Sequence, residues 1–196
     1  GSCNRNGIAY LRIDHRGCGQ SQGIFEEVTS LAARCRDLLA ACAWARAEAK
    51  LTNRIGLFGS SMGGTVCLAT AGDIDIDAIV TVAAPVRSRS LVDSAHHTTN
   101  HSTGSAIFSS PERQFDIRPK LAAVSNILLF HGEDDEIVPL DHAHEILAAV
   151  KEPKQLVVHT NGDHRMSSPV DQAEFIELAT EWFRRSLIAS PADAHL

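Results

Sequence analysis

The amino-acid sequence predicts an α/β domain with a mostly parallel sheet flanked by helices. Strand and helix signals alternate along the whole 196-residue chain, which is the order typical of parallel strands joined by helical crossovers. The strand segments are short and almost entirely apolar, as expected of strands that helices cover on both faces. The length fits a single domain spanning residues 1–196, large enough to bury a substantial core.

Five segments are predicted to form strands, because each is a short apolar run bounded by turn residues. The first is residues 8–14, which a glycine-rich loop at 15–23 follows. The other four are residues 54–59, 78–84, 127–131 and 155–159.

Helices are predicted between and after these strands. Residues 30–49 form a long alanine-rich stretch, and Ser30 is placed to cap its N-terminus. The remaining predicted helices are residues 65–71, 140–150 and the amphipathic segment 170–188.

Residues 86–125 interrupt this alternation. The span is rich in Ser, Thr and His and has no long periodic element. Because loops of this length inside compact domains are usually functional, we expect a short lid or loop insertion here, which would also determine specificity. The tail at 190–196 is expected to be disordered.

Composition excludes several classes of function. A formal net charge of −6 argues against nucleic acid as a partner, because binding requires cations that neutralise phosphates. No apolar run approaches the roughly 18 residues that span a bilayer, and no signal peptide is visible, so we expect a cytoplasmic protein without a membrane partner. Five cysteines without a CxxC pair argue against disulfides and zinc, and indicate a reducing compartment.

The most informative motif lies in residues 55–65, which read IGLFGSSMGGT. An apolar run, a Gly-x-Ser-x-Gly turn and a helix-forming stretch follow one another, which is the context of a nucleophilic serine. A turn this sharp is expected to need small residues at Gly59 and Gly63, and to hold Ser61 in strained backbone geometry. Ser60 lacks the flanking glycines, so Ser61 is the predicted nucleophile.

A serine hydroxyl needs a base, and the base needs an acid to orient it. In an open α/β sheet these groups should follow the carboxyl ends of strands. Two loops meet this requirement: residues 131–139, HGEDDEIVP, after the fourth predicted strand, and residues 161–165, NGDHR, after the fifth. The chain order Ser, Asp, His is that of α/β-hydrolases.

Three segments carry a resemblance to that superfamily. HGEDDEIVP resembles its HGxxDxxVP loop, and NGDHRMS resembles its (G)xDH(x)xS histidine loop. Residues 14–21, DHRGCGQS, with Gly23 and Phe25, resemble the DxRGxGxS.G.F turn after its fourth strand. The chain therefore resembles the small serine esterases of the α/β-hydrolase superfamily, including cinnamoyl or feruloyl esterases and serine aminopeptidase-like hydrolases.

The resemblance assigns a role to each matching position. It implies that Ser61 is the nucleophile, Asp135 the orienting acid and His164 the general base. The backbone N–H of Met62 would be one oxyanion donor. Asp134 is the alternative acid, although the spacing from both ends of the HGxxDxxVP pattern favours Asp135.

Neighbouring polar residues are expected to have other roles. Glu133 and Glu136 are predicted to be solvated, and Asp163 to structure the histidine loop. His15 and Arg16 are predicted to brace the loop that follows the first strand.

The resemblance also implies elements that precede this sequence. Family members have three strands and a helix before the 14–21 turn, whereas seven residues precede the predicted strand 8–14 here. We therefore expect an α/β-hydrolase fold that is truncated at its N-terminus and lacks the loop that donates the second oxyanion N–H. Direct pairing of 8–14 with 54–59 would contradict this expectation.

The expected function is a serine hydrolase, of the carboxylesterase type, that acts on small acyl esters through an acyl-enzyme. A peptidase or thioesterase with the same triad, or a non-catalytic hydrolase-like binding protein, are the alternatives. No cofactor or metal is expected, because the histidines of the 86–125 span lack accompanying carboxylate or thiolate ligands. These histidines are His96, His97 and His101.

Overall fold

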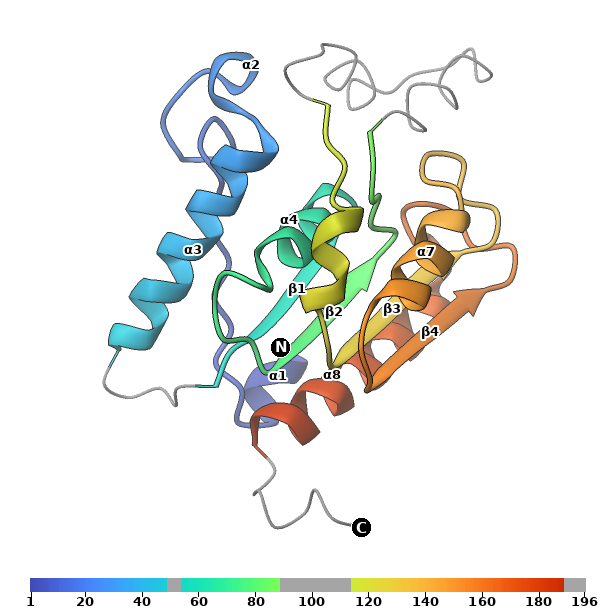
Figure 1. The fold of residues 1–196 in the computed structure, drawn as a ribbon. Helices are drawn as coiled ribbons and strands as arrows, with labels where there is room; N and C mark the ends of the chain where they lie inside the picture. The colour runs from blue at the N-terminus through green and yellow to red at the C-terminus, as the bar shows by residue number, and fades with distance from the viewer. Residues whose placement is uncertain (49–53, 89–113, 189–196) are drawn as a thin grey trace.

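The computed structural model describes residues 1–48, 54–88 and 114–188. Its centre is a four-stranded parallel sheet in the order β1-β2-β3-β4 (Figure 1). The strands are β1 Gly56–Ser60, β2 Ala78–Val82, β3 Ile127–Gly132 and β4 Lys154–His159. Since all four run in the same direction, their carboxyl ends lie along one edge of the sheet, and the loops that follow them meet there.

Helices cover both faces of the sheet. In Figure 1, α4 and α7 lie in front of the strands and α8 lies behind them. The helices are α1 Ser2–Arg5, α2 Phe25–Val28, α3 Leu31–Ala47, α4 Met62–Thr70, α7 Asp141–Ala149 and α8 Pro169–Leu187, with a 3₁₀ helix, η2, at Arg118–Ala123. The predicted fold class, a parallel sheet between helical layers, is confirmed.

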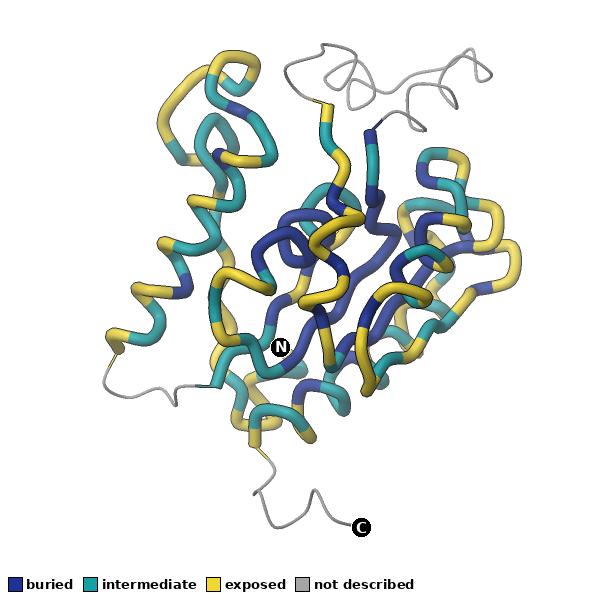
Figure 2. The backbone as a smooth tube through the Cα atoms, viewed as in Figure 1, coloured by how far each residue is buried: buried dark blue, intermediate teal, exposed yellow. Residues whose placement is uncertain are grey.

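Two apolar clusters hold these layers together, one on each face. The first joins the sheet to α3, α4, η2 and α7 through residues such as Cys42, Leu68 and Ile146. The second joins it to α8 through Phe130 and Phe183. Every residue of β2 and β3 is buried, and these strands form the dark centre of Figure 2. Burial on both faces explains why these two strands are wholly apolar or nearly so in sequence.

Local sequence signals set the start of the long helices. Ser30 caps α3, because its Oγ accepts a hydrogen bond of 3.1 Å from the Ala33 N–H. Ser168 caps α8 in the same way, and Pro169 occupies the first helical position, where a missing N–H costs nothing. The cap predicted at Ser30 is therefore confirmed.

The strand predicted at residues 8–14 is wrong. This segment has no strand conformation, and Tyr10 and Leu11 are 62% and 49% exposed. Within the described residues β1 pairs only with β2, so its other edge does not bond to 8–14. Apolar composition indicates burial, but a strand also requires a neighbouring strand to which its backbone can bond. Direct pairing, which would contradict the expected truncation, is not observed.

Within the predicted 86–125 insertion, residues 86–88 lie beside residues 115–117. Arg87 and Asp116 form an antiparallel bridge, and the Ser88 N–H donates to the Phe115 carbonyl over 3.0 Å. The 3₁₀ helix η2 follows, an element that the sequence did not predict. Most of the predicted lid, with His96, His97 and His101, and the predicted disordered tail lie outside the described residues.

Among the described helices, none is long and apolar enough to cross a membrane.

His142 connects α7 to the segment after β2. The side chain is fully buried, and its Nδ1 accepts a hydrogen bond of 3.0 Å from the Val86 N–H. An accepting Nδ1 carries no proton, which fits a neutral ring. Burial, reinforced by the nearby Arg87 guanidinium, lowers the pKa of His142 to about 4.

This depressed pKa predicts acid sensitivity. Because the ring takes up a proton more readily when unfolded, its contribution to stability is complete above pH 6.5 and is lost progressively down to pH 4. Between these values the free energy of unfolding should fall by on the order of 3 kcal/mol from this group. Urea unfolding across this range should show a flatter profile for His142→Gln, whose amide oxygen accepts from Val86 without titrating. Identical profiles would contradict the assignment.

Candidate active site

Ser61 lies at a sharp turn between β1 and α4. Its φ and ψ are 51° and −123°, a backbone conformation that L-residues rarely adopt. The Ser61 N–H donates to the Val82 carbonyl over 2.7 Å, which ties the turn to the end of β2. The predicted strain at Ser61 is therefore present, and the neighbouring strand maintains it.

Small residues were predicted to be required at Gly59 and Gly63, and the structure bears this out only for Gly59. A Cβ on Gly59 would lie 2.3 Å from the backbone carbonyl of Gly63, so no side chain fits there. A Cβ on Gly63, by contrast, would meet no atom within 4 Å, and the requirement predicted for Gly63 is wrong. The crowded position is Gly64, where a Cβ would lie 2.6 Å from that of Ala84. The close contact between α4 and the neighbouring strand segment therefore falls at Gly64, one residue after Gly63.

Ser61, His164 and Asp135 form a continuous chain of hydrogen-bonding contacts. His164 Nε2 lies 3.2 Å from Ser61 Oγ. On the other side of the ring, Nδ1 lies 2.8 Å from Asp135 Oδ2 and 3.0 Å from Oδ1. The structure thus brings together the three residues that the motifs assign to nucleophile, base and acid, from loops after β1, β4 and β3.

The Asp135 carboxylate is fully buried and has several donors. Backbone N–H groups of Ile137 and Val138 donate to Oδ1 over 2.9 and 2.7 Å. Burial alone would raise the pKa of Asp135, but the hydrogen bonds from His131, His164 and Val138 outweigh it and hold the pKa well below its ordinary value. The group is therefore ionised at neutral pH and complements a proton on His164 Nδ1.

The neighbouring acids do not share this environment. Asp134 is exposed, and its backbone N–H donates a hydrogen bond of 3.0 Å to the Gly162 carbonyl. Glu133 and Glu136 are exposed, as predicted. Glu136 has a further contact, since its carboxylate accepts from the His164 N–H over 3.3 Å. Geometry therefore favours Asp135 over Asp134 as the partner of His164.

The loop that carries His164 is fixed by short contacts. Asp163 accepts hydrogen bonds from the Ser167 N–H and hydroxyl, over 2.8 and 2.6 Å, in the loop-structuring role predicted for it. A Cβ on Gly132 would lie 2.2 Å from the Gly162 carbonyl oxygen, so this loop lies directly against the end of β3. The two loops that supply Asp135 and His164 are therefore packed backbone to backbone.

Met62 is the first residue of α4, directly after Ser61. Backbone N–H groups in the first turn of a helix have no partner within the helix and favour negative charge. This is the position at which the sequence predicts an oxyanion donor. An oxyanion that forms on a substrate attacked by Ser61 would lie within the field of this helix end.

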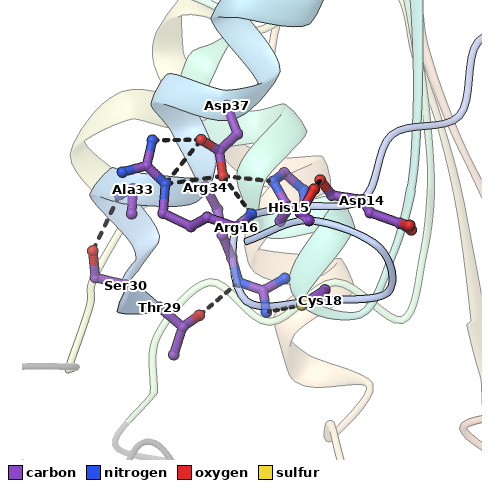
Figure 3. A network of polar contacts seen from close by, with 10 residues as sticks. Asp14, His15, Arg16, Cys18, Thr29, Ser30, Ala33, Arg34 and Asp37 are labelled. Atoms are coloured by element: carbon purple, nitrogen blue, oxygen red, sulfur yellow. Dashed lines mark hydrogen bonds and ion pairs between the residues drawn. The ribbon is translucent and has the colours of Figure 1, made fainter. Parts of the chain in front are cut away.

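The loop after residues 8–14 is braced against α3 (Figure 3). The Arg16 guanidinium forms a bidentate contact with Asp37, in which Nε and Nη2 donate to Oδ1 over 2.9 and 2.6 Å. Arg34 lies below this pair and donates to Thr29 Oγ1 over 3.1 Å. His15 lies beside the same carboxylate, and burial lowers its pKa. The predicted bracing role of His15 and Arg16 agrees with these contacts.

No group of three or more His, Cys, Asp or Glu side chains within the described ranges is arranged to hold a metal ion. All five cysteines are free thiols. Burial raises the pKa of Cys67 to about 12, and it also raises the pKa values of Cys35 and Cys42. Protonated, enclosed thiols are poor nucleophiles, so Ser61 is a better candidate than Cys35, Cys42 or Cys67.

From the sequence, His131 had no predicted role at this site beyond its place in the HGEDDEIVP motif. His131 lies at the end of β3 with 1% of its side chain exposed, and its Nε2 is 3.3 Å from Asp135 Oδ2. The four-residue spacing of His131 and Asp135 within HGEDD was the available signal. Spacing alone did not reveal this contact, because the distance between the two side chains depends on how the residues between them fold.

Comparison with known proteins identifies the family and supports the fold. The profile of the prolyl oligopeptidase family, a family of hydrolases, matches residues 2–189. Among solved structures, the chain is similar to the esterase domain of a Rhodothermus marinus protein, with 26% identity and a TM-score of 0.67 over 95% of this chain and 77% of that one. An esterase from Pyrococcus furiosus shares the fold, with a TM-score of 0.80, 20% identity, and coverage of 94% of this chain and 72% of that one.

A curated relative is longer than this chain. The uncharacterized protein YfhR of Escherichia coli O157:H7 is 30% identical over 155 residues, which cover 78% of this chain and 51% of that protein. The chain therefore spans about half the length of the curated relatives it matches. Since the family profile extends over nearly every residue and the structural neighbours are α/β serine hydrolases and esterases, the chain has the α/β-hydrolase fold and belongs to the prolyl oligopeptidase family.

Proposed function

We propose that this protein is a serine hydrolase that cleaves carboxylic esters through an acyl-enzyme intermediate. The observation that carries the proposal is the continuous contact from Ser61 Oγ through His164 to the buried Asp135 carboxylate. A serine hydroxyl outside such an arrangement is a weak nucleophile, whereas here a base is within reach and a carboxylate orients it.

The proposed reaction begins with attack of Ser61 Oγ on the acyl carbonyl carbon as His164 Nε2 takes the hydroxyl proton. The Met62 N–H donates to the resulting oxyanion, and Asp135 stabilises the imidazolium. His164 then gives its proton to the leaving alcohol, and the ester C–O bond breaks. Water, activated by the same histidine, attacks the acyl-enzyme and releases the acid and free Ser61.

Esters are the proposed substrates because the similar Rhodothermus marinus domain, at 26% identity, is described as an esterase. The family name supports a second candidate, a peptidase that uses the same residues. Both reactions pass through an acyl-enzyme and differ in the leaving group, which is an alcohol or an amine. Comparing ester and amide substrates that share one acyl group therefore separates the candidates.

The test is covalent labelling with a fluorophosphonate probe, followed by peptide mapping. We expect one labelled residue, Ser61, and loss of labelling in Ser61→Ala and His164→Ala. Ser60→Ala is the matched control. Ser60 is the last residue of β1, directly before Ser61, and its replacement should leave labelling intact. A folded wild-type protein that is not labelled, or is labelled elsewhere, would contradict the proposal. Preferential cleavage of amides would favour the peptidase.

A further inference from the structure

His131 forms a second buried contact with Asp135, in addition to that of His164. Its ring Nε2 is 2.7 Å from the Val138 carbonyl oxygen and 3.3 Å from Asp135 Oδ2. The exposed fractions of the two side chains are 1% and 0%. Water therefore does not compete for these contacts, and the imidazole is in place to influence how the carboxylate lies.

The Val138 carbonyl determines the protonation of this nitrogen. A carbonyl oxygen only accepts hydrogen bonds, so at 2.7 Å the Nε2 atom of His131 must carry a proton. The same N–H lies 3.3 Å from Asp135 Oδ2 and is shared with it as a weaker, second contact. The Nε2–H of His131 therefore lies against both the Val138 carbonyl and the Asp135 carboxylate.

Val138 contacts both His131 and Asp135, so the three residues form a closed set of contacts. While its carbonyl accepts from His131, its own N–H donates to Asp135 Oδ1 over 2.7 Å. One oxygen of the carboxylate is thus held through Val138 and the other directly by His131. With both oxygens restrained, the plane of the carboxylate cannot rotate freely about the Cβ–Cγ bond.

The orientation of this plane matters because His164 uses both oxygens. Its Nδ1 lies 2.8 and 3.0 Å from Oδ2 and Oδ1 of Asp135. Rotation of the carboxylate would move one oxygen away from His164 Nδ1. The His164 ring would then lose the alignment that brings its Nε2 to 3.2 Å from Ser61 Oγ. Small displacements of this kind reduce rates strongly, by about 10²-fold for 1 Å.

We propose that His131 is a positioning residue for Asp135, so that its contact with the carboxylate sets the alignment of His164 on Ser61. The inference rests on the proposed serine hydrolase function. His131 does not contact Ser61, and its effect should therefore fall on kcat while KM changes little.

Three variants test this assignment. His131→Leu keeps an apolar body of similar size but removes the donor. His131→Gln keeps an N–H donor at a comparable reach. His159→Gln is the matched control, because His159 is a buried histidine at the end of the adjacent strand, paired in register with Gly132. Its Nε2 lies 3.4 Å from Glu174 Oε2, a carboxylate outside the Ser61–His164–Asp135 chain.

Rates should be measured per active site titrated with the fluorophosphonate, so that unfolded protein does not count. We expect His131→Leu to lower kcat by about 10- to 100-fold with KM within about twofold. His131→Gln should recover most of this loss, and His159→Gln should remain close to wild type. A wild-type kcat in His131→Leu, or equal losses in the Leu and Gln variants, would overturn the proposal in favour of simple packing.

A second measurement does not depend on activity. The Nδ1–H of His164 should give a downfield proton resonance in histidine-labelled protein, because it donates to an ionised carboxylate. We expect this resonance to shift or disappear in His131→Leu and to persist in His131→Gln. An unchanged resonance in the folded Leu variant would overturn the proposal. If the wild-type protein lacks Ser61-dependent hydrolysis, the proposed function fails, while this resonance still decides the role of His131.

Discussion

Replacing Asp135 by asparagine is expected to lower kcat/KM by about 10⁴-fold while the fold is retained. The reason is the proton on His164. Asp135 accepts from Nδ1, whereas an asparagine amide nitrogen in the same place donates, which favours the tautomer that carries its proton on Nε2. In that tautomer Nε2 cannot take the proton of Ser61 Oγ, 3.2 Å away.

Steady-state kinetics of Asp135→Asn on the best ester, with circular dichroism to verify folding, measure this effect. Asp134→Asn is the matched control, because Asp134 is exposed and the variant keeps the backbone N–H that donates to the Gly162 carbonyl. We expect activity within about twofold of wild type for this control. Equal losses in both variants, or a stronger loss at Asp134, would reassign the acid.

The second large effect concerns the glycines of the serine turn. Gly59→Ala is expected to destabilise the protein by about 3 kcal/mol or more, because its Cβ would lie 2.3 Å from the Gly63 backbone. For a chain of this size such a loss corresponds to a fall in Tm of roughly 6–12 °C. Backbone atoms cannot move aside as a flexible side chain can, so the end of β1 and the start of α4 must separate.

Gly63→Ala is the matched comparison, because its Cβ would meet nothing within 4 Å and the residue lies within α4. Alanine favours helix over glycine, so we expect this variant to be as stable as wild type or up to about 1 kcal/mol more stable. Thermal unfolding of the two variants measures the difference. A similar Tm for both, or a lower Tm for Gly63→Ala, would contradict the packing described at this turn.

The part of the fold that the sequence predicted best is the part buried on both faces. Apart from Thr81 and His131, β2 and β3 are runs of apolar or small residues enclosed by helices, and burial leaves few alternatives for such segments. Residues 8–14 have a similar composition and were predicted wrongly, because their composition carries no information about which strand would pair with them. The short helices α2 and η2 were missed because four to six residues do not complete an amphipathic repeat.

At the candidate site, motif spacing predicted the residues that meet, but not the contacts that hold them. Ser61, Asp135 and His164 were found because each follows a strand at a fixed interval within a recognisable loop. The contact of His131 with Asp135, and the crowding at Gly64 in place of Gly63, depend on the path of the backbone between motifs. Sequence patterns specify residue types, whereas these contacts depend on distances of a few tenths of an ångström.

The positions of Ser61 and His164 in the chain, 103 residues apart, have a consequence for biosynthesis. Domains are made from the N-terminus, so the proposed nucleophile leaves the ribosome well before the proposed base. Ser61 acquires a proton acceptor only after β4, the last strand of the sheet, has joined β3 and brought the His164 loop against Gly132. Under the proposed function, a nascent chain in which β4 has not yet paired with β3 carries an unactivated serine, and hydrolysis begins only after this pairing.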